Sequence, residues 1–327
     1  MKHLFLINPA AGKYDHTYEC TEKVHAAARE AGLNYAIQVS HQAGDLRRFA
    51  REACETGEAL RLYACGGDGS LNEVVCGAAG FPNAALTHIP LGSGNDFIKI
   101  FSDPARFRDL PALFDGEEAA LDLIRCGRDH YAINICSIGF DARIGTEIAR
   151  YKRLPGVSGS GAYILSAAVN FIRGIHAPYT VEIDGEVFEG RRSMISICSG
   201  RFYGGGFCPV PEAEPDDGML DVLLVAPVSR LQVPKVINPY KHGHYRDYPE
   251  LFRHFRAKEI TVRCEKESVV NLDGEAVFTK EAHFSVVPQG IRFFYPKGLT
   301  YHAAAAAATV LNRLNRERSV LWLIPSS

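Results

Sequence analysis

Hydrophobic residues in the first third of the chain follow two alternating patterns. Short continuous hydrophobic runs predict buried strands, and they cover residues 3–8, 34–39, 59–65 and 84–91. Between these runs the hydrophobic positions recur at helical spacing, in residues 18–31, 44–56 and 70–79. Strands that alternate with helices in this way favour a parallel sheet. The first part of the chain therefore predicts an α/β domain.

From about residue 121 onward, the pattern changes to short runs rich in β-branched residues and bounded by turns. Such runs predict a mostly antiparallel β domain, with hairpin turns at Asp184-Gly185 and Asp273-Gly274. A helical stretch at 162–175 interrupts these strands, and the tail 303–318 also has helical propensity. We expect that tail to pack back on the first domain. The expected domains are residues 1–125, with 293–327 returning to them, and residues 126–292.

The composition is that of an ordinary globular protein of about two domains. The 327 residues are 46% hydrophobic and 23% charged, with a formal net charge of −2. This balance provides no basic field for nucleic acid, which we exclude as a partner. The nine cysteines form no C-x-x-C pair, so we expect buried free thiols in a reducing cytoplasm. We find no signal peptide and no apolar stretch near the ~20 residues of a membrane span, and therefore expect a cytoplasmic protein.

The strongest chemical signal is the glycine-rich segment 66–70, Gly-Gly-Asp-Gly-Ser, between a predicted strand and a predicted helix. Glycines let the backbone approach a ligand closely, and amides at a helix N-terminus favour anions. Taken alone, the segment is more typical of a plain turn in which Ser70 caps the helix.

Two more loops follow strands of the same predicted sheet. Residues 8–13, Asn-Pro-Ala-Ala-Gly-Lys, follow the first strand, and residues 92–96, Gly-Ser-Gly-Asn-Asp, follow a later one. Ligands of open parallel sheets bind beyond the carboxyl ends of the strands, so the three loops predict one phosphate site. The chain has no Walker A sequence, which excludes a P-loop enzyme.

Acidic residues in predicted turns suit phosphoryl transfer, which needs charge neutralisation and a group that accepts the hydroxyl proton. Asp68 lies in the glycine-rich segment, Asp273 and Glu275 flank a glycine, and Asp217 precedes a predicted strand. Magnesium prefers such carboxylates. Each residue also has a structural alternative, as part of a turn or hairpin, and Asp96 has one as a helix cap.

Together these segments resemble the diacylglycerol kinase catalytic domain family, which includes sphingosine and ceramide kinases and soluble bacterial lipid kinases. The resemblance extends over nearly the whole chain, through Gly139-Phe140-Asp141-Ala142, Tyr203-Gly204-Gly205-Gly206, Asp216-Asp217-Gly218-Met219-Leu220-Asp221 and Asp273-Gly274-Glu275. It implies a Rossmann-like nucleotide domain joined to a β-sandwich domain, with ATP in the cleft between them. Ser70 and Ser93 stand where threonine is usual, and each keeps the hydroxyl group.

The resemblance implies a lipid kinase that transfers the γ-phosphate of ATP to a hydroxyl group of a lipid such as diacylglycerol. It implies Asp273 as the general base, with Glu275 as the next candidate, and Asp68 as a ligand of magnesium or water. A structural Mg²⁺ is implied at Glu214, Asp217 and Met219, the last through its backbone carbonyl. The residues implied for ATP are Asn8, Pro9, Ala10, Gly12, Lys13, Ser40, Gly66, Gly67, Asp68, Gly69, Ser70, Asn72, Glu73, Gly92, Ser93, Asn95 and Asp96.

Two other functions stay open at this point. One is phosphorylation of a soluble metabolite by an enzyme of the NAD kinase type, and the other is a non-catalytic sensor of nucleotide or lipid. Asn8-Pro9 and the loop 92–97 favour the lipid branch, and the three acidic candidates favour catalysis. The sequence does not name the lipid.

The expected partners follow from a lipid substrate and a chain without an expected membrane span. We expect reversible, peripheral contact with the inner membrane surface. A homodimer is among the assemblies that we expect. The basic cluster at 241–246 is typical of a solvated face, and contact with lipid headgroups is the alternative.

Overall fold

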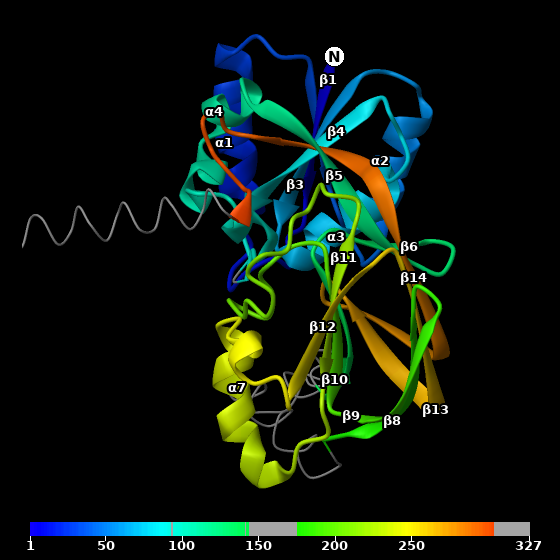
Figure 1. Ribbon diagram of the computed structural model, residues 1–327. Coiled ribbons are helices and arrows are strands. Elements are labelled where there is room, and N and C mark those ends of the chain that lie inside the picture. The colour runs from blue at the N-terminus through cyan, green and yellow to red at the C-terminus, as the bar shows by residue number, and fades with distance from the viewer. Residues whose placement is uncertain (93, 141, 144–174, 304–327) are drawn as a thin grey trace, which may run out of the picture.

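The computed structural model describes residues 1–92, 94–140, 142–143 and 175–303. Ser93, the body of the predicted helix at 162–175 and the predicted helical tail after residue 303 lie outside the described residues. Figure 1 shows the first strands and helices in one half of the molecule and strands β8 to β13 in the other. In the described part of the chain, no helix is both long and apolar enough to cross a bilayer.

The first half is built on a parallel sheet, as the hydrophobic runs predict. Its strands lie in the order β2-β1-β3-β4 and are all parallel. They are β1 (Lys2–Ile7), β2 (Tyr35–Val39), β3 (Leu60–Gly66) and β4 (Ala84–Pro90). The connecting helices are α1 (Thr17–Glu30), α2 (Asp45–Glu55) and α3 (Asp68–Ala78). Every residue of β3 and β4 is buried, which explains why these strands show continuous hydrophobic runs.

The second half is antiparallel, as predicted, and both predicted hairpin turns are present. Asp184-Gly185 joins β8 to β9 and Asp273-Gly274 joins β13 to β14, with positive φ at all four residues. The strands are β5 (Glu117–Cys126), β6 (His130–Ala132), β7 (Ile135–Gly139), β8 (Ala177–Ile183), β9 (Glu186–Arg192), β10 (Met194–Cys198), β11 (Leu220–Val225), β12 (Phe252–Ala257), β13 (Glu259–Leu272) and β14 (Glu275–Tyr295).

Short helical elements complete the fold. The sequence pattern did not predict the helix that follows β11. The elements are η1 (Phe97–Ile100), η2 (Pro104–Arg108), α4 (Leu110–Phe114), η3 (Arg230–Gln232), α7 (Val233–Lys241) and η4 (Tyr245–Asp247).

Strand β14 connects the two halves because it is 21 residues long. Its first part pairs with β13, and its last part pairs with β5 and, through Arg292 and Phe293, in parallel with β4. The sheet therefore continues from the antiparallel half into the parallel half. The hairpin turn before β14 and the loop after β4 therefore extend from strands of one continuous sheet.

A buried arginine also joins loops of the two halves. Arg201 is 3% exposed and donates hydrogen bonds to the carbonyl oxygens of Ile100 (3.0 Å), Ala213 (3.2 Å) and Tyr301. Burial lowers its pKa, and the carboxylate of Glu214 opposes that change. The guanidinium group thus satisfies carbonyl groups that would otherwise be buried without donors.

Gly77 tests how tightly α2 packs on α3. A Cβ at residue 77 would lie 2.7 Å from Ala50 Cβ and would also collide with the Arg47 carbonyl oxygen. Helix propensity alone favours alanine over glycine by about 1 kcal/mol. Overpacking against a backbone atom costs about 1–3 kcal/mol, so Gly77→Ala should lower the free energy of unfolding. Urea unfolding measures this quantity, and a gain in stability would contradict the packing described for this helix pair.

Candidate active site

A cavity of about 610 Å³ lies at the carboxyl ends of the parallel strands. It is lined by the loops after β1, β2, β3 and β4 and by the hairpin turn between β13 and β14. The lining residues are Asn8, Pro9, Ala10, Ala11, Gly12, Ser40, His41, Gln42, Ala43, Gly67, Asp68, Gly69, Ser70, Glu73, Gly92, Gly94, Asp273, Gly274 and Glu275. The structure thus brings the three predicted loops and the predicted acidic turn together.

Two of the glycine loops are held backbone to backbone. The Gly66 carbonyl oxygen accepts hydrogen bonds from the amides of Leu91 (2.8 Å) and Gly92 (3.1 Å). It also lies 3.0 Å from Nε2 of buried His88, which must be the donor because a carbonyl oxygen only accepts. Burial lowers the pKa of His88 to about 4, so its ring is neutral near neutral pH. One carbonyl oxygen therefore fixes the distance between the loops.

The third loop is tied to the same place by a side-chain hydrogen bond. Asn8 Nδ2 donates to Ser70 Oγ at 2.9 Å, and the Asn8 carboxamide oxygen accepts from the Ala10 amide at 3.0 Å. Ser70 lies inside α3, and the residue at the N-cap is Gly67, so the helix-cap role considered for Ser70 is wrong. Among the residues that the structure describes, no side chain caps the N-terminus of α3, so its first amides are available to an anion at the cavity.

Asp68 begins α3 and is mostly buried at the cavity wall. Its Oδ1 accepts a hydrogen bond from the Asp96 amide at 2.5 Å. Burial raises the pKa of Asp68 to about 6, and the negative charge of Asp96 adds to the rise. A divalent cation at this carboxylate would favour its charged form, so the site suits a metal ligand.

Asp96 does not line the cavity. Its Oδ2 accepts a hydrogen bond from the Gly205 amide at 2.7 Å, and its other oxygen forms an ion pair with Lys99. Asp96 occupies the N-cap position of η1 without capping it. Its side chain instead connects the loop after β4 to the glycine turn 204–206 of the other half.

The two carboxylates of the hairpin turn have different surroundings. Asp273 Oδ2 accepts hydrogen bonds from the amides of Ile133 (2.7 Å) and Asn134 (3.3 Å), and Oδ1 accepts from Ile135 (2.8 Å). Burial raises the pKa of Asp273 to about 6, although these three hydrogen bonds lower it. Asp273 is thus engaged with the backbone that enters β7.

Glu275 faces the glycine loop. Its Oε1 lies 3.5 Å from the position that a Cβ would take at Gly69. Within the described part of the chain, its carboxylate makes no hydrogen bond. Burial raises the pKa of Glu275, and the charge of Glu73 adds to this effect. Its oxygens are therefore available to a molecule in the cavity.

Two other residues predicted for ATP serve the protein itself. Glu73 accepts hydrogen bonds from the amides of Gly44 (3.0 Å), Leu46 (3.1 Å) and Arg47 (3.4 Å), and it therefore caps α2. Asn72 donates to the Tyr131 carbonyl oxygen at 2.8 Å. Among the described residues predicted for ATP, five do not line the cavity: Lys13, Gly66, Asn72, Asn95 and Asp96.

Sequence reasoning missed other lining residues, mainly His41, Gln42 and Ala43. They follow Ser40 directly after β2, and the position of that strand in the parallel sheet was the signal that could have identified them.

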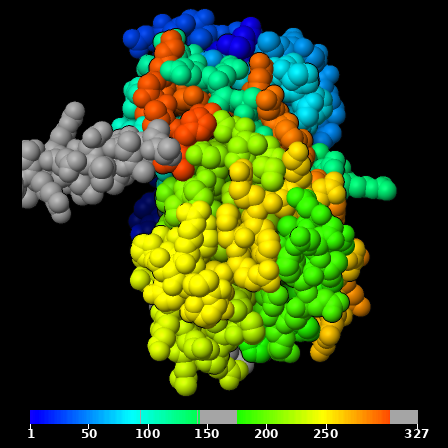
Figure 2. Space-filling view, viewed as in Figure 1, coloured from blue at the N-terminus to red at the C-terminus, as the bar shows by residue number. Residues whose placement is uncertain are grey.

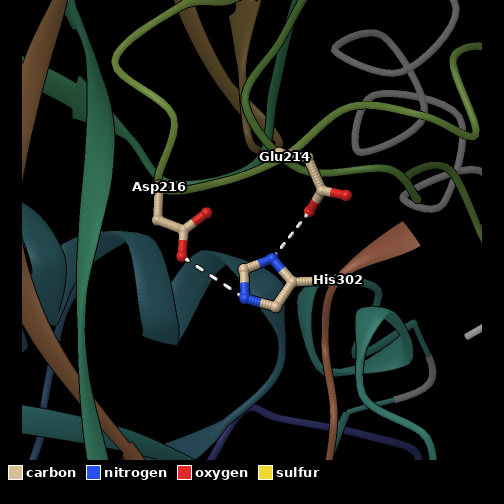
Figure 3. A group of neighbouring side chains, drawn as sticks. All are labelled: Glu214, Asp216 and His302. Atoms are coloured by element: carbon tan, nitrogen blue, oxygen red, sulfur yellow. Dashed lines mark hydrogen bonds and ion pairs between the residues drawn. The ribbon is translucent and has the colours of Figure 1, made fainter. Parts of the chain in front are cut away.

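The residues predicted for structural magnesium separate into two groups. Figure 3 shows Glu214 and Asp216 on either side of His302, with Nδ1 3.2 Å from Glu214 Oε2 and Nε2 3.8 Å from Asp216 Oδ2. Asp217 instead pairs with Arg256, and its Oδ1 accepts from the Met219 amide at 3.0 Å. The Glu214 and Asp217 carboxylates are not brought into one cluster. Magnesium binding at these residues stays a prediction.

Two family models match the chain. The model for the diacylglycerol kinase catalytic domain matches residues 2–126. The model for the YegS C-terminal NAD kinase beta sandwich-like domain matches residues 134–295.

Similar proteins support the same family. A Pseudomonas aeruginosa (strain PAO1) protein described as "probable lipid kinase YegS-like" is 32% identical over 274 residues, which cover 84% of this chain and 88% of the relative. A Shewanella frigidimarina protein of the same description is 30% identical and covers 83% of this chain and 87% of the relative.

Solved structures support the fold. A diacylglycerol kinase structure from Bacillus anthracis has a TM-score of 0.63 at 20% identity and covers 90% of this chain and 97% of that one. A second structure from that organism reaches a TM-score of 0.71 at 22% identity, with 91% of this chain and 98% of that one covered. With these matches the sequence resemblance is confirmed: the chain belongs to the YegS-like lipid kinase family, which carries the diacylglycerol kinase catalytic domain, and it is an ATP-dependent kinase.

Proposed function

We propose that the chain transfers the γ-phosphoryl group of ATP to a hydroxyl group of a lipid alcohol, with diacylglycerol as the first candidate. The observation that carries the proposal is the single cavity formed by the glycine loops, the uncapped start of α3 and the turn that bears Glu275. The relatives named as lipid kinases support the substrate class.

The phosphate groups of ATP are held by backbone donors in this proposal. The start of α3 lines the cavity, where its first amides would bind an anion, and the glycines at 67 and 69 place no side chain in its way. In phosphoryl transfer, positioning and charge neutralisation provide most of the catalysis. The close packing of the two glycine loops would supply the positioning.

Magnesium is the cofactor that this chemistry requires. The residues fit it at Asp68, because Gly94 leaves space beside that carboxylate that a Cβ would fill. Asp68 would hold the ion, and the bound ion would neutralise phosphate charge. The structural magnesium ion that the sequence resemblance implies at Glu214, Asp217 and Met219 is a separate proposal.

Glu275 is the residue that we propose accepts the proton of the lipid hydroxyl group. Its carboxylate lines the cavity, and its raised pKa brings it closer to the operating pH of a general base. Asp273, the first choice from sequence, would instead position the turn, because three backbone amides already engage its oxygens.

An apolar cavity in the second half is the proposed place for the hydrocarbon part of the substrate. It lies between the β10–β11 strands and α7. Its lining residues are Phe140, Ile175, Ser193, Met194, Phe207, Val225, Val228, Val233, Val236, Ile237 and Tyr240. Phe207 ends the glycine turn whose Gly205 amide binds Asp96, so one turn links this cavity to the phosphate loops. The proposed reaction takes place at the cytoplasmic membrane surface.

The proposed activity predicts transfer of label from γ-labelled ATP to a lipid product. With Mg²⁺ and a panel of lipid alcohols, dioctanoylglycerol should gain one phosphoryl group, identified by the mass of the product. NAD serves as the soluble comparison substrate. Labelling of NAD with no lipid product would contradict the proposal.

The nucleotide loops predict a selective defect in Gly67→Ala. The φ at Gly67 is −102°, which alanine adopts, and a Cβ there lies 3.4 Å from Gly92 Cα, an ordinary contact. The fold should survive while the methyl group crowds the phosphates, and ATP affinity should fall roughly tenfold or more, about 1.4 kcal/mol. Gly92→Ala is the contrast, because its Cβ would lie 2.5 Å from Gly67 Cα and should reduce stability as well. Wild-type affinity in Gly67→Ala would remove this loop from the ATP site.

The assignment of Glu275 predicts that Glu275→Gln lowers turnover by about 10²–10⁴-fold, with ATP affinity and unfolding unchanged. Glu265→Gln on β13 is the matched control and should keep wild-type turnover.

Asp273→Asn should also lose stability, about 1–3 kcal/mol, because its amide group would face backbone N–H donors. The assignment would be contradicted if Glu275→Gln kept wild-type turnover while Asp273→Asn folded normally and turned over slowly. Asp273 would then be the base.

A further inference from the structure

One segment of the second half is basic and contains no acidic residue. Between Ala226 and Arg246 the chain has Arg230, Lys235 and Lys241 but neither aspartate nor glutamate, although the whole protein carries a net charge of −2. The segment forms η3 and α7. Its charge is therefore a local feature, opposite in sign to that of the chain.

Exposed apolar side chains lie within this basic segment. Leu231 is 90% exposed, which is the highest value among the large hydrophobic residues that the structure describes, and Ile237 is 47% exposed. A single exposed leucine is ordinary on a protein surface. Here, however, it lies between Arg230 and Lys235 in the chain, and all three are exposed, so cationic and apolar groups are close neighbours along this segment.

The two sides of α7 face different surroundings. Val233, Val236, Ile237 and Tyr240 recur at helical spacing and line the apolar cavity, although Ile237 is also partly exposed. Lys235 and Lys241 are exposed on the remaining surface of the helix. Figure 2 shows this part of the chain, in yellow, at the molecular surface.

We infer that the outer side of η3 and α7 is the surface through which the protein contacts an anionic lipid bilayer. The inference rests on the proposed lipid-kinase function. Basic residues are attracted to the negative surface of a membrane, and an exposed leucine among them can enter the region between headgroups and acyl chains. The basic side chains complement the negative charge of an anionic bilayer, and the exposed Leu231 complements its apolar interior.

Contact at this surface also explains how a lipid reaches the reaction. The inner side of the same helix forms a wall of the apolar cavity, so a bilayer against the outer side lies about 10 Å, one helix diameter, from the cavity. At the cavity, the Tyr203 hydroxyl group lies 2.8 Å from that of Tyr240. The Gly205 amide donates to Asp96, whose own amide donates to Asp68. A lipid taken from the bilayer would therefore have a short distance to travel to the cavity.

Another exposed apolar residue provides the comparison. Val187 on β9 is 56% exposed, but Glu186 and Glu189 lie beside it in sequence. Glu182 pairs with Val187 from the neighbouring strand β8, whereas the two arginines of β9, Arg191 and Arg192, lie at its far end. The carboxylates next to Val187 would oppose its contact with an anionic bilayer, so Val187 offers a matched position for the same substitution.

The test is flotation of the full chain with vesicles. Vesicles of phosphatidylglycerol mixed with phosphatidylcholine should bind the wild type, and vesicles of phosphatidylcholine alone should bind it less. Leu231→Asp and Lys235→Glu should each weaken binding to the anionic vesicles roughly fivefold or more, and raised salt should have the same direction of effect. Val187→Asp and Lys258→Glu, the matched controls, should bind as the wild type does.

Turnover measured on dispersed dioctanoylglycerol distinguishes a loss of membrane binding from a loss of kinase activity. It should be unchanged in Leu231→Asp and Lys235→Glu, since neither residue lines the apolar cavity or the phosphate cavity. Wild-type vesicle binding in both variants, or no preference of the wild type for anionic vesicles, would overturn the membrane surface. Absence of lipid turnover in the wild type would instead overturn the lipid-kinase proposal.

Discussion

The contact between the backbones of two glycine loops is the constraint on which the site depends. A Cβ at Gly92 would lie 2.5 Å from Gly67 Cα, so only glycine allows the loops after β3 and β4 to meet. The Gly66 carbonyl oxygen holds that contact through two amides and the His88 ring. Because the loops are fixed in this way, the first residues of α3 line the cavity. Among the described residues, the buried Nδ1 atom of His88 has no hydrogen-bond partner. Burial of this unpaired atom lowers the stability of the folded protein.

The second constraint is the long strand β14, which brings the acidic turn to the same cavity as the glycine loops. Its later residues pair with β4, and its start is the hairpin that bears Asp273 and Glu275. Asp273 anchors the turn by accepting three backbone amides, and Glu275 is then held over Gly69. The same sheet therefore positions the groups proposed to bind phosphate and the carboxylate proposed to accept a proton.

Local sequence patterns predicted the parallel sheet, the antiparallel half and the meeting of the three loops. Those features follow from continuous hydrophobic runs and from the rule that strands of a parallel sheet share one carboxyl edge. The patterns could not show that Glu73 caps α2, or that Asp273 binds the backbone at 133–135, because the partners are far away in sequence. Nor could they show that β14 spans both halves, since its register shifts between Val287 and Ile291 and no single period covers it. The sequence motifs selected Glu73, Asp273 and Glu275 alike. Only their contacts in the folded protein distinguish the residues that hold the backbone in place from the one whose carboxylate is available for chemistry.

A crystal structure of the protein with Mg²⁺ and a non-hydrolysable ATP analogue would show whether the triphosphate binds at the start of α3. We predict phosphate oxygens within hydrogen-bond distance of the amides of Gly67 to Ser70, with Asp68 at the metal and the terminal phosphate facing Glu275. A triphosphate bound away from the start of α3, or a terminal phosphate that faces away from the 273–275 turn, would contradict it.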